Sequence, residues 1–175
     1  MEIRFNRNDL LAKLISRKAM RYDVKGKRYI STPYKYYFVD SGLRNARLNF
    51  RQSEQTHLME NIIYVELLRR GYSVDVGVVE VKDSMGDGRY QRKHLEVDFV
   101  VNRGSERLYI QSAFALPDPE KIQQEKRPLI SIPDSFRKLI VVKEDILPLH
   151  DDEGVLTISL WDFLLRPELL EGLVL

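Results

Sequence analysis

The 175-residue sequence contains no cysteine and only three histidines, His57, His94 and His150. Without cysteine the chain forms no disulfide and offers no thiolate to a metal, and three scattered histidines argue against a zinc site. A cysteine-free chain also suits a reducing compartment. We therefore expect a cytoplasmic protein.

Long apolar segments are missing as well. No stretch approaches the ~20 apolar residues of a membrane-spanning helix, and the first ten residues, MEIRFNRNDL, lack the apolar core of a signal peptide. These absences predict a soluble protein without a membrane partner. Because 43% of the residues are hydrophobic, the chain is able to bury one core and make one domain.

The basic residues are unevenly distributed along the chain. Residues 1–53 carry 13 Lys and Arg against 4 Asp and Glu, whereas residues 54–175 carry 15 against 22. We interpret 1–53 as a small basic appendage and 54–175 as the main domain. The positive excess permits a surface for nucleic acid or an acidic partner, and an ordinary solvated face explains it equally well. The candidate nucleic-acid-binding residues are Lys25, Lys27, Arg28, Arg92 and Lys93.

Local patterns in the first part predict a helix followed by extended segments. Asn8 or Asp9 is placed to cap a short helix that reaches about Met20. Alternation around the Lys-Gly pair of MRYDVKGKRYIST indicates a β-hairpin, and KYYFVD is typical of another extended piece. One or two helical turns are expected over 43–48.

The second part alternates helices and strands. The 54–70 segment has the strongest helical pattern, closed by Gly71 as a C-terminal cap. Asp118 and the proline after it start a second helix, which we expect to stop before Pro128. Residues 82–94 look like a polar, mobile loop. The predicted strands lie at 74–81, 95–102, 108–115, 138–143 and 155–160, and a short helix lies at 161–165.

This order predicts an α/β fold with a mixed sheet and helices on both faces. Its centre is LEVDFVVNRGSERLYIQSAFAL, an antiparallel hairpin whose turn places Asp98 opposite or diagonal to Gln111. The helix over 118–126 is long enough to cross over and let the 138–143 strand join in parallel.

Three polar residues fall on this core in a pattern that resembles PD-(D/E)XK nucleases. In that fold a helix Glu, a strand Asp and a (Glu/Gln)-x-Lys on the next strand converge on a divalent metal. Glu60 matches the helix Glu, Asp98 the strand Asp and Gln111 the start of the last motif, but Ala113 stands where the motif has lysine. The resemblance implies a restriction-endonuclease-like fold and makes Asp98 and Glu60 candidate magnesium ligands. A structural ion pair is the alternative interpretation of either carboxylate.

A closer resemblance runs across most of the chain. The segments RYDVKGKRYISTPYKYYFVDSGLRNA, ENIIYVELLRRGY, EVDFVV, YIQSAFAL and RPLISIPDSFRKLIVV resemble, in that order, the C-terminal domain of uncharacterised bacterial and archaeal AAA-type ATPases. That family implies a nuclease-like domain behind an N-terminal ATPase module. This sequence has no GxxxxGK(S/T) phosphate loop, so it is either a fragment of such a protein or a stand-alone remnant.

These resemblances predict an accessory domain that works with an ATPase module and binds nucleic acid or a protein without catalysis, because Gln111 is uncharged and Ala113 supplies no cation. The alternative is a magnesium- or manganese-dependent DNA endonuclease with a migrated lysine. The candidate lysines are Lys82, Lys93 and Lys138. A Lys or Arg nitrogen within reach of the Asp98 carboxylate discriminates the two hypotheses. A third hypothesis, a protein-binding toxin, antitoxin or defence accessory, predicts an exposed apolar patch.

Overall fold

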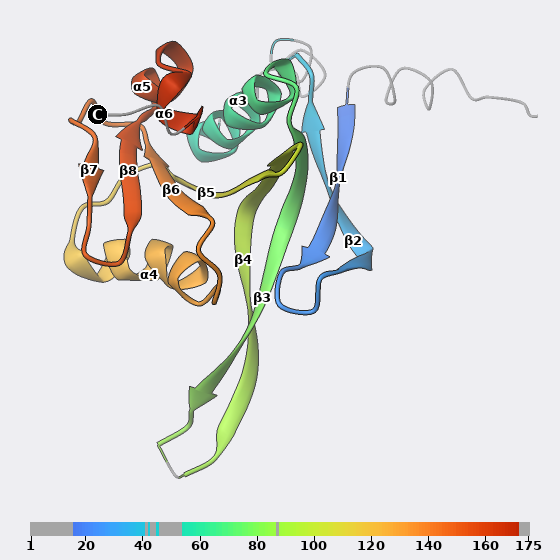
Figure 1. Cartoon of the computed structure of the whole chain (residues 1–175), viewed down its shortest axis with the longest axis vertical. Helices are drawn as coiled ribbons and strands as arrows, with labels where there is room; N and C mark the ends of the chain where they lie inside the picture. The colour runs from blue at the N-terminus through green and yellow to red at the C-terminus, as the bar shows by residue number, and fades with distance from the viewer. Residues whose placement is uncertain (1–15, 41, 43–44, 46–53, 87, 172–175) are drawn as a thin grey trace, which may run out of the picture.

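One mixed β-sheet organises the part of the chain that the computed structural model describes, which is residues 16–40, 42, 45, 54–86 and 88–171. Its eight strands lie in the order β2-β1-β3-β4-β5-β6-β8-β7 (Figure 1). The strands are β1 (Ser16–Asp23), β2 (Arg28–Phe38), β3 (Ser73–Ser84), β4 (Tyr90–Arg103), β5 (Glu106–Ala113), β6 (Arg137–Val142), β7 (Leu149–His150) and β8 (Val155–Ser159). The helices are α3 (Gln55–Arg69), α4 (Pro119–Ile130), α5 (Leu160–Leu165) and α6 (Glu168–Glu171). The protein therefore has the predicted α/β class with a mixed sheet.

The central strands form an antiparallel meander followed by a parallel crossover. β3 pairs antiparallel with β4, and β4 pairs antiparallel with β5. The chain then passes through α4, so that β6 pairs parallel to β5 and β8 pairs parallel to β6. The four strands predicted for this region are confirmed, although β3 and β4 extend further than expected.

Helices cover both faces of the sheet. Along β6 the buried residues alternate between two apolar clusters, because successive side chains of a strand point to opposite faces. One cluster contains Ile63 and Leu67 of α3 and Phe163 of α5. The other contains Leu129 of α4. No helix in the described ranges is long and apolar enough to span a membrane.

The β1–β2 hairpin is continuous with this sheet. β1 pairs antiparallel with β2 and, over Arg21–Asp23, parallel with β3. The predicted hairpin is thus confirmed, and KYYFVD largely belongs to β2. The predicted helix is wrong at residues 16–20, which form β1, and its earlier residues lie outside the described ranges, as does most of 43–48. Ala19 and Tyr37 join the same core as α3, and the division at residue 53 stays a prediction.

Helix α3 ends where the sequence predicts. Gly71 adopts a φ of +79°, the left-handed conformation that glycine enters without steric cost. Its N–H donates to the carbonyl of Leu68 over 2.9 Å, and the N–H of Tyr72 donates to the carbonyl of Leu67 over 3.1 Å. These two bonds form a Schellman motif, which satisfies the last carbonyls of the helix.

A two-stranded arm projects from the sheet (Figure 1). β3 and β4 stay paired from Glu80 with His94 as far as Ser84 with Tyr90. The prediction of a polar loop over 82–94 is therefore wrong for most of its length. Apolar and polar residues do not alternate along this segment as they do in a half-buried strand. Cross-strand hydrogen bonds hold the two strands together instead. We call the described residues between 80 and 94 the arm.

Helix α4 begins as predicted and ends later. The Asp118 Oδ1 accepts a hydrogen bond from the N–H of Lys121 over 2.7 Å, which caps the helix. The helix continues through Pro128 to Ile130, so the predicted stop before Pro128 is wrong. A proline this close to the C-terminal end of the helix removes one backbone hydrogen bond, and the Pro128 side chain is buried.

Candidate functional site

Asp98 and Gln111 meet where β4 and β5 separate. The regular ladder between these strands runs up to the pair Phe99 and Ile110. Beyond that pair, hydrogen bonds between side chains and backbone N–H groups connect the two strands in place of backbone–backbone bonds. The N–H of Ser112 donates to Oδ2 of Asp98 over 2.8 Å, and the N–H of Asp98 donates to Oε1 of Gln111 over 3.4 Å. The expected proximity of the two residues is confirmed.

A lysine from β2 lies among the carboxylates of this region. The Nζ of Lys35 lies 2.5 Å from Oε1 of Glu60 and 3.8 Å from Oδ1 of Asp98. It also lies 3.1 Å from Oε1 of Glu96, whose Oε2 pairs with Arg21 at 2.6 Å. We call Lys35, Glu60, Glu96 and Asp98 the Lys35 cluster. The predicted convergence of Glu60 and Asp98 is confirmed, because both lie within ion-pair distance of one nitrogen.

Lys35 was not among the lysines proposed from the sequence. It stands two residues before Tyr37, which is buried, and side chains two apart on a strand share a face. The Tyr37 hydroxyl donates to Oε1 of Glu60 over 2.6 Å, and its ring stacks on Tyr64 with centroids 4.0 Å apart. The Lys-x-Tyr spacing on a strand was the available signal. That spacing did not reveal which carboxylates Lys35 would contact, because the position of α3 against β2 does not follow from it.

Burial and charge together set the protonation of the cluster. Burial, reinforced by the charge of Glu60, raises the pKa of Asp98 to about 7, although Lys35 opposes the shift. Burial disfavours the Lys35 ammonium, but the charges of Glu60 and Asp98 outweigh it and raise the pKa of Lys35. Burial of Glu96 is likewise outweighed by Lys35 and Arg21, so the pKa of Glu96 is lowered. The cluster thus holds a persistent cation beside a carboxyl that changes charge near neutral pH.

Gln111 is turned toward the other face of the sheet. Its Nε2 donates to Oε2 of Glu125 on α4 over 3.1 Å, and Oε1 of Glu125 lies 2.5 Å from Nζ of Lys121. Gln111 therefore touches Asp98 through the Asp98 backbone. Ala113 is buried in the apolar cluster on the α4 side. Of the three-part pattern, the structure brings the side chains of Glu60 and Asp98 together and directs that of Gln111 elsewhere.

Magnesium does not fit this arrangement. Carboxylate oxygens are ligands that Mg²⁺ prefers, but the ammonium of Lys35 occupies the space between Glu60 and Asp98. Within the described ranges, no group of three or more His, Cys, Asp or Glu is arranged to hold a metal. The cluster is an internal ion-pair network whose cation comes from the chain itself.

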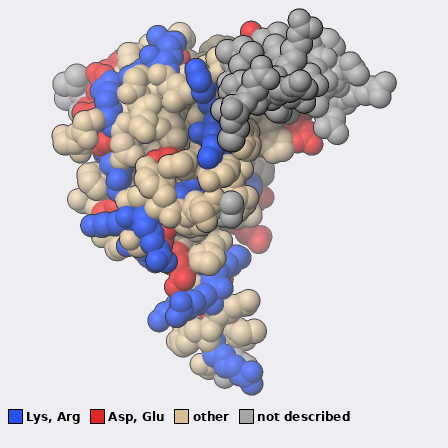
Figure 2. Space-filling view, turned by 90° about the vertical axis from the view of Figure 1, so that its right-hand side faces the viewer, with Lys and Arg blue, Asp and Glu red and all other residues tan. Residues whose placement is uncertain are grey.

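The predicted nucleic-acid-binding residues fall on three surfaces. Lys25, Arg28 and Arg92 line one groove between the β1–β2 turn and the arm. Lys27 lines a second groove. Lys93 lies on the opposite face of the arm from Arg92, because its cross-strand partner Val81 packs against the α4-side cluster. Figure 2 shows Lys and Arg side chains along the arm and on the body next to it.

Comparisons with known proteins place a related segment in a longer protein. The chain is 35% identical over 149 residues to an uncharacterised protein of Haemophilus influenzae. The match covers 85% of this chain and 33% of the relative, so the chain spans about a third of the curated relative it matches. No protein-family model matches the chain, and no solved structure matches it.

Proposed function

We propose that this chain is the accessory domain of a longer protein that carries an AAA-type ATPase module. We further propose that its nuclease-like site binds nucleic acid or a protein without catalysing a reaction. The element order α3-β3-β4-β5-α4-β6, with two antiparallel pairings and then a parallel one, supports a restriction-endonuclease-like core. The two thirds of the Haemophilus influenzae relative outside the match leave room for the module. A cysteine-free chain supports a cytoplasmic location.

The position of Lys35 carries the proposal that the site is not catalytic. Phosphodiester hydrolysis on this fold requires a metal held by oxygen ligands and a separate cation that assists the attacking water. Lys35 instead takes the place of the metal, since its ammonium is the ion that neutralises Glu60 and Asp98. The motif position for the assisting lysine is Ala113, whose methyl group is buried.

The same lysine favours a second candidate function. Its Nζ lies 3.8 Å from Oδ1 of Asp98, which is the feature expected of an endonuclease with a migrated lysine. In that function Lys35 would be the positioned cation and the carboxylates would have to rearrange around a metal. Binding of a protein alone, through an apolar surface, stays a prediction.

Incubation of the pure chain with supercoiled and branched DNA, in magnesium and in manganese, separates the two candidates. We expect no cleavage by the wild type, because the site lacks a free set of metal ligands. Asp98→Ala and Lys35→Met are the matched variants. Nicking that both substitutions abolish would establish the endonuclease and refute our proposal, whereas nicking that survives Asp98→Ala comes from a contaminant. The ATPase part is tested by ATP hydrolysis with the full-length relative.

A further inference from the structure

We propose that one face of the arm, together with the β1–β2 turn, is a binding surface for B-form DNA, and that the duplex lies along the face that leads to the Lys35 cluster. This inference rests on the proposed function and names its partner. It uses residues of the arm that the nuclease-like pattern leaves out.

Strand register defines the face. Residues directly opposite in an antiparallel pair share a face, and so do residues two apart on one strand. The pairs Lys82 with Arg92 and Ser84 with Tyr90 therefore lie on one face of the arm. Two residues beyond His94, the same face of β4 reaches Glu96, which contacts Lys35. A ligand on this face follows β4 from the arm to the cluster.

The groove between the arm and the β1–β2 turn carries excess positive charge. Four cations line it against two carboxylates. The cations are Lys25, Arg28, Lys82 and Arg92, and the carboxylates are Asp23 and Glu80. Arg28 and Arg92 pair with these two carboxylates, at 3.5 Å from Asp23 and 3.7 Å from Glu80. Their side chains are 79% and 74% exposed, so a ligand is able to reach them, and the groove keeps two positive charges in excess. The Nζ of Lys25 donates to the carbonyl of Glu80, which holds the turn against the base of the arm.

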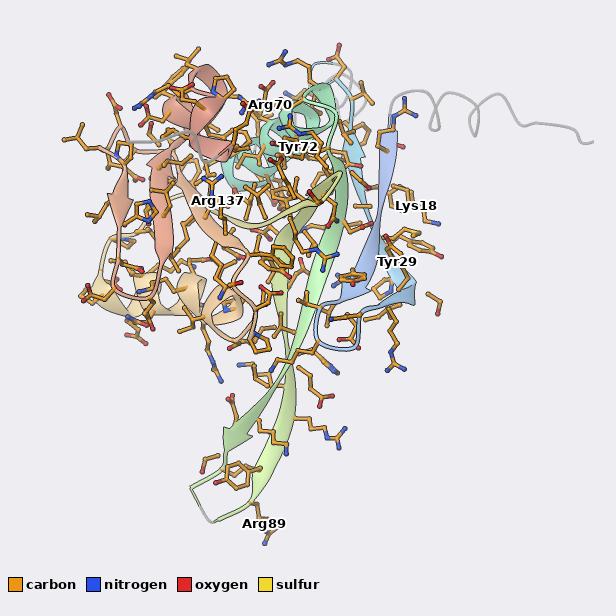
Figure 3. All side chains as sticks on the ribbon, in the orientation of Figure 1. Lys18, Tyr29, Arg70, Tyr72, Arg89 and Arg137 are labelled. Atoms are coloured by element: carbon orange, nitrogen blue, oxygen red, sulfur yellow. The ribbon has the colours of Figure 1, made fainter. Side chains whose placement is uncertain are left out.

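The outer arm has the shape and side chains for a DNA groove. Tyr90 is 71% exposed and Met85 60% exposed, so neither contributes to the core. Arg89 lies close to the tip of the arm (Figure 3). A two-stranded ribbon fits the major groove of B-form DNA, which is about 12 Å wide. The major groove of A-form RNA is too narrow for side chains to read, so the arm favours DNA over an RNA duplex.

Fluorescence anisotropy with a labelled 24-base-pair DNA duplex tests the surface on the full chain. We expect wild-type affinity to fall steeply with salt, because each neutralised phosphate contributes about −0.9 to the slope of log K against log salt. The double substitution Lys82→Gln, Arg92→Gln should reduce the slope by about 2 and weaken binding by tenfold or more at 100 mM salt. The matched control is Lys93→Gln, which removes one charge from the opposite face of the same arm. It should leave both quantities close to wild type.

The RNA duplex of the same sequence and the single DNA strand are the competing ligands, and both should bind at least tenfold more weakly. Thermal unfolding checks that each variant keeps the wild-type fold. If the double variant does not keep the wild-type fold, the single substitution Lys82→Gln is measured in its place. Equal binding of DNA and RNA duplexes, or equal losses in the Lys82 and Lys93 variants, would overturn the proposal. Absence of DNA binding at 20 mM salt would also overturn it and leave the arm to a protein partner.

These outcomes are separable from those for the site. Loss of binding in the arm variants without any cleavage upholds both proposals. DNA that is bound through Lys82 and Arg92 and then cut in an Asp98-dependent way upholds the surface and overturns the non-catalytic function. No binding and no cleavage overturn the surface alone.

Discussion

Removal of the Lys35 ammonium tests whether the Lys35 cluster depends on its internal cation. In Lys35→Met the side chain keeps about the same length and loses its charge. Glu60 and Asp98 then face each other without the Lys35 cation, while Arg21 still pairs with Glu96. The hydroxyl of Tyr37 is the remaining donor to Glu60. The folded state should therefore lose stability at a pH where the carboxylates are ionised.

The magnitude follows from the distances and the burial. A pair of unit charges 4 Å apart attracts by about 4 kcal/mol at an effective dielectric constant of 20. Desolvation offsets most of this attraction, and removal of one partner from a buried pair costs about 3–5 kcal/mol. Because the Lys35 side chain is 28% exposed, we expect the lower end of that range, about 3 kcal/mol at pH 8.

The loss should shrink as the pH falls. The pKa of Asp98 is already raised in the folded protein, and without Lys35 it rises further. The folded variant then binds a proton that the unfolded chain has released, so lowering the pH from 8 to 5.5 stabilises it. Urea denaturation at both pH values gives the free energy of unfolding.

Lys18→Met is the matched control for this substitution. Lys18 lies on the neighbouring strand, opposite Tyr36, and its Nζ sits 3.4 Å from the centroid of the Tyr34 ring. Figure 3 shows it at the outer side of the hairpin. Loss of an exposed cation–π contact costs about 0.5–1 kcal/mol at either pH. Equal losses in the two variants at pH 8, or a Lys35→Met loss that does not change with pH, would refute the argument.

Two further substitutions test single features. In Asp98→Asn the group with the raised pKa is gone. Because the pKa of Asp98 is raised to about 7 in the folded protein, the wild type should lose stability relative to this variant as the pH rises from 4 to 8, by on the order of a few kcal/mol. Thermal unfolding across that range measures the difference. Gly71→Ala should cost about 1–2 kcal/mol in urea denaturation, because an added Cβ meets no atom within 4 Å and the strain of the +79° φ is the whole effect. A neutral result would show that the helix end relaxes.

The central elements were predictable because local signals and the sheet agree. The 54–70 periodicity, the glycine after it and the Asp118 cap each have a local cause, and the structure contains all three. The approach of Asp98 to Gln111 followed from the hairpin turn and the register that it sets. These signals span a few residues, and a single sequence displays them.

The arm and the Lys35 cluster depend on contacts between distant segments. The paired strands of the arm carry polar side chains on both faces, so alternation did not distinguish them from a loop. Lys35 is 25 residues from Glu60 and 63 from Asp98 in the numbering, and β1 must first pair with β3 to bring it near them. The Pro128 error has a different origin, because the proline rule applies to helix interiors more strictly than to the last turn.

The long strand β4 gives the protein a mechanical property. It runs from Tyr90 in the arm, past Asp98, where its register with β3 shifts, to Arg103 at the other end of the strand. The eight residue steps from Tyr90 to Asp98 span about 26 Å, at about 3.3 Å per step, and Asp98 lies where the β4–β5 ladder ends. At that point Ser112 and Gln111 hold Asp98 by two hydrogen bonds. A load on the tip is therefore carried toward Asp98 along the β3–β4 pairs, and those two bonds join this part of β4 to β5.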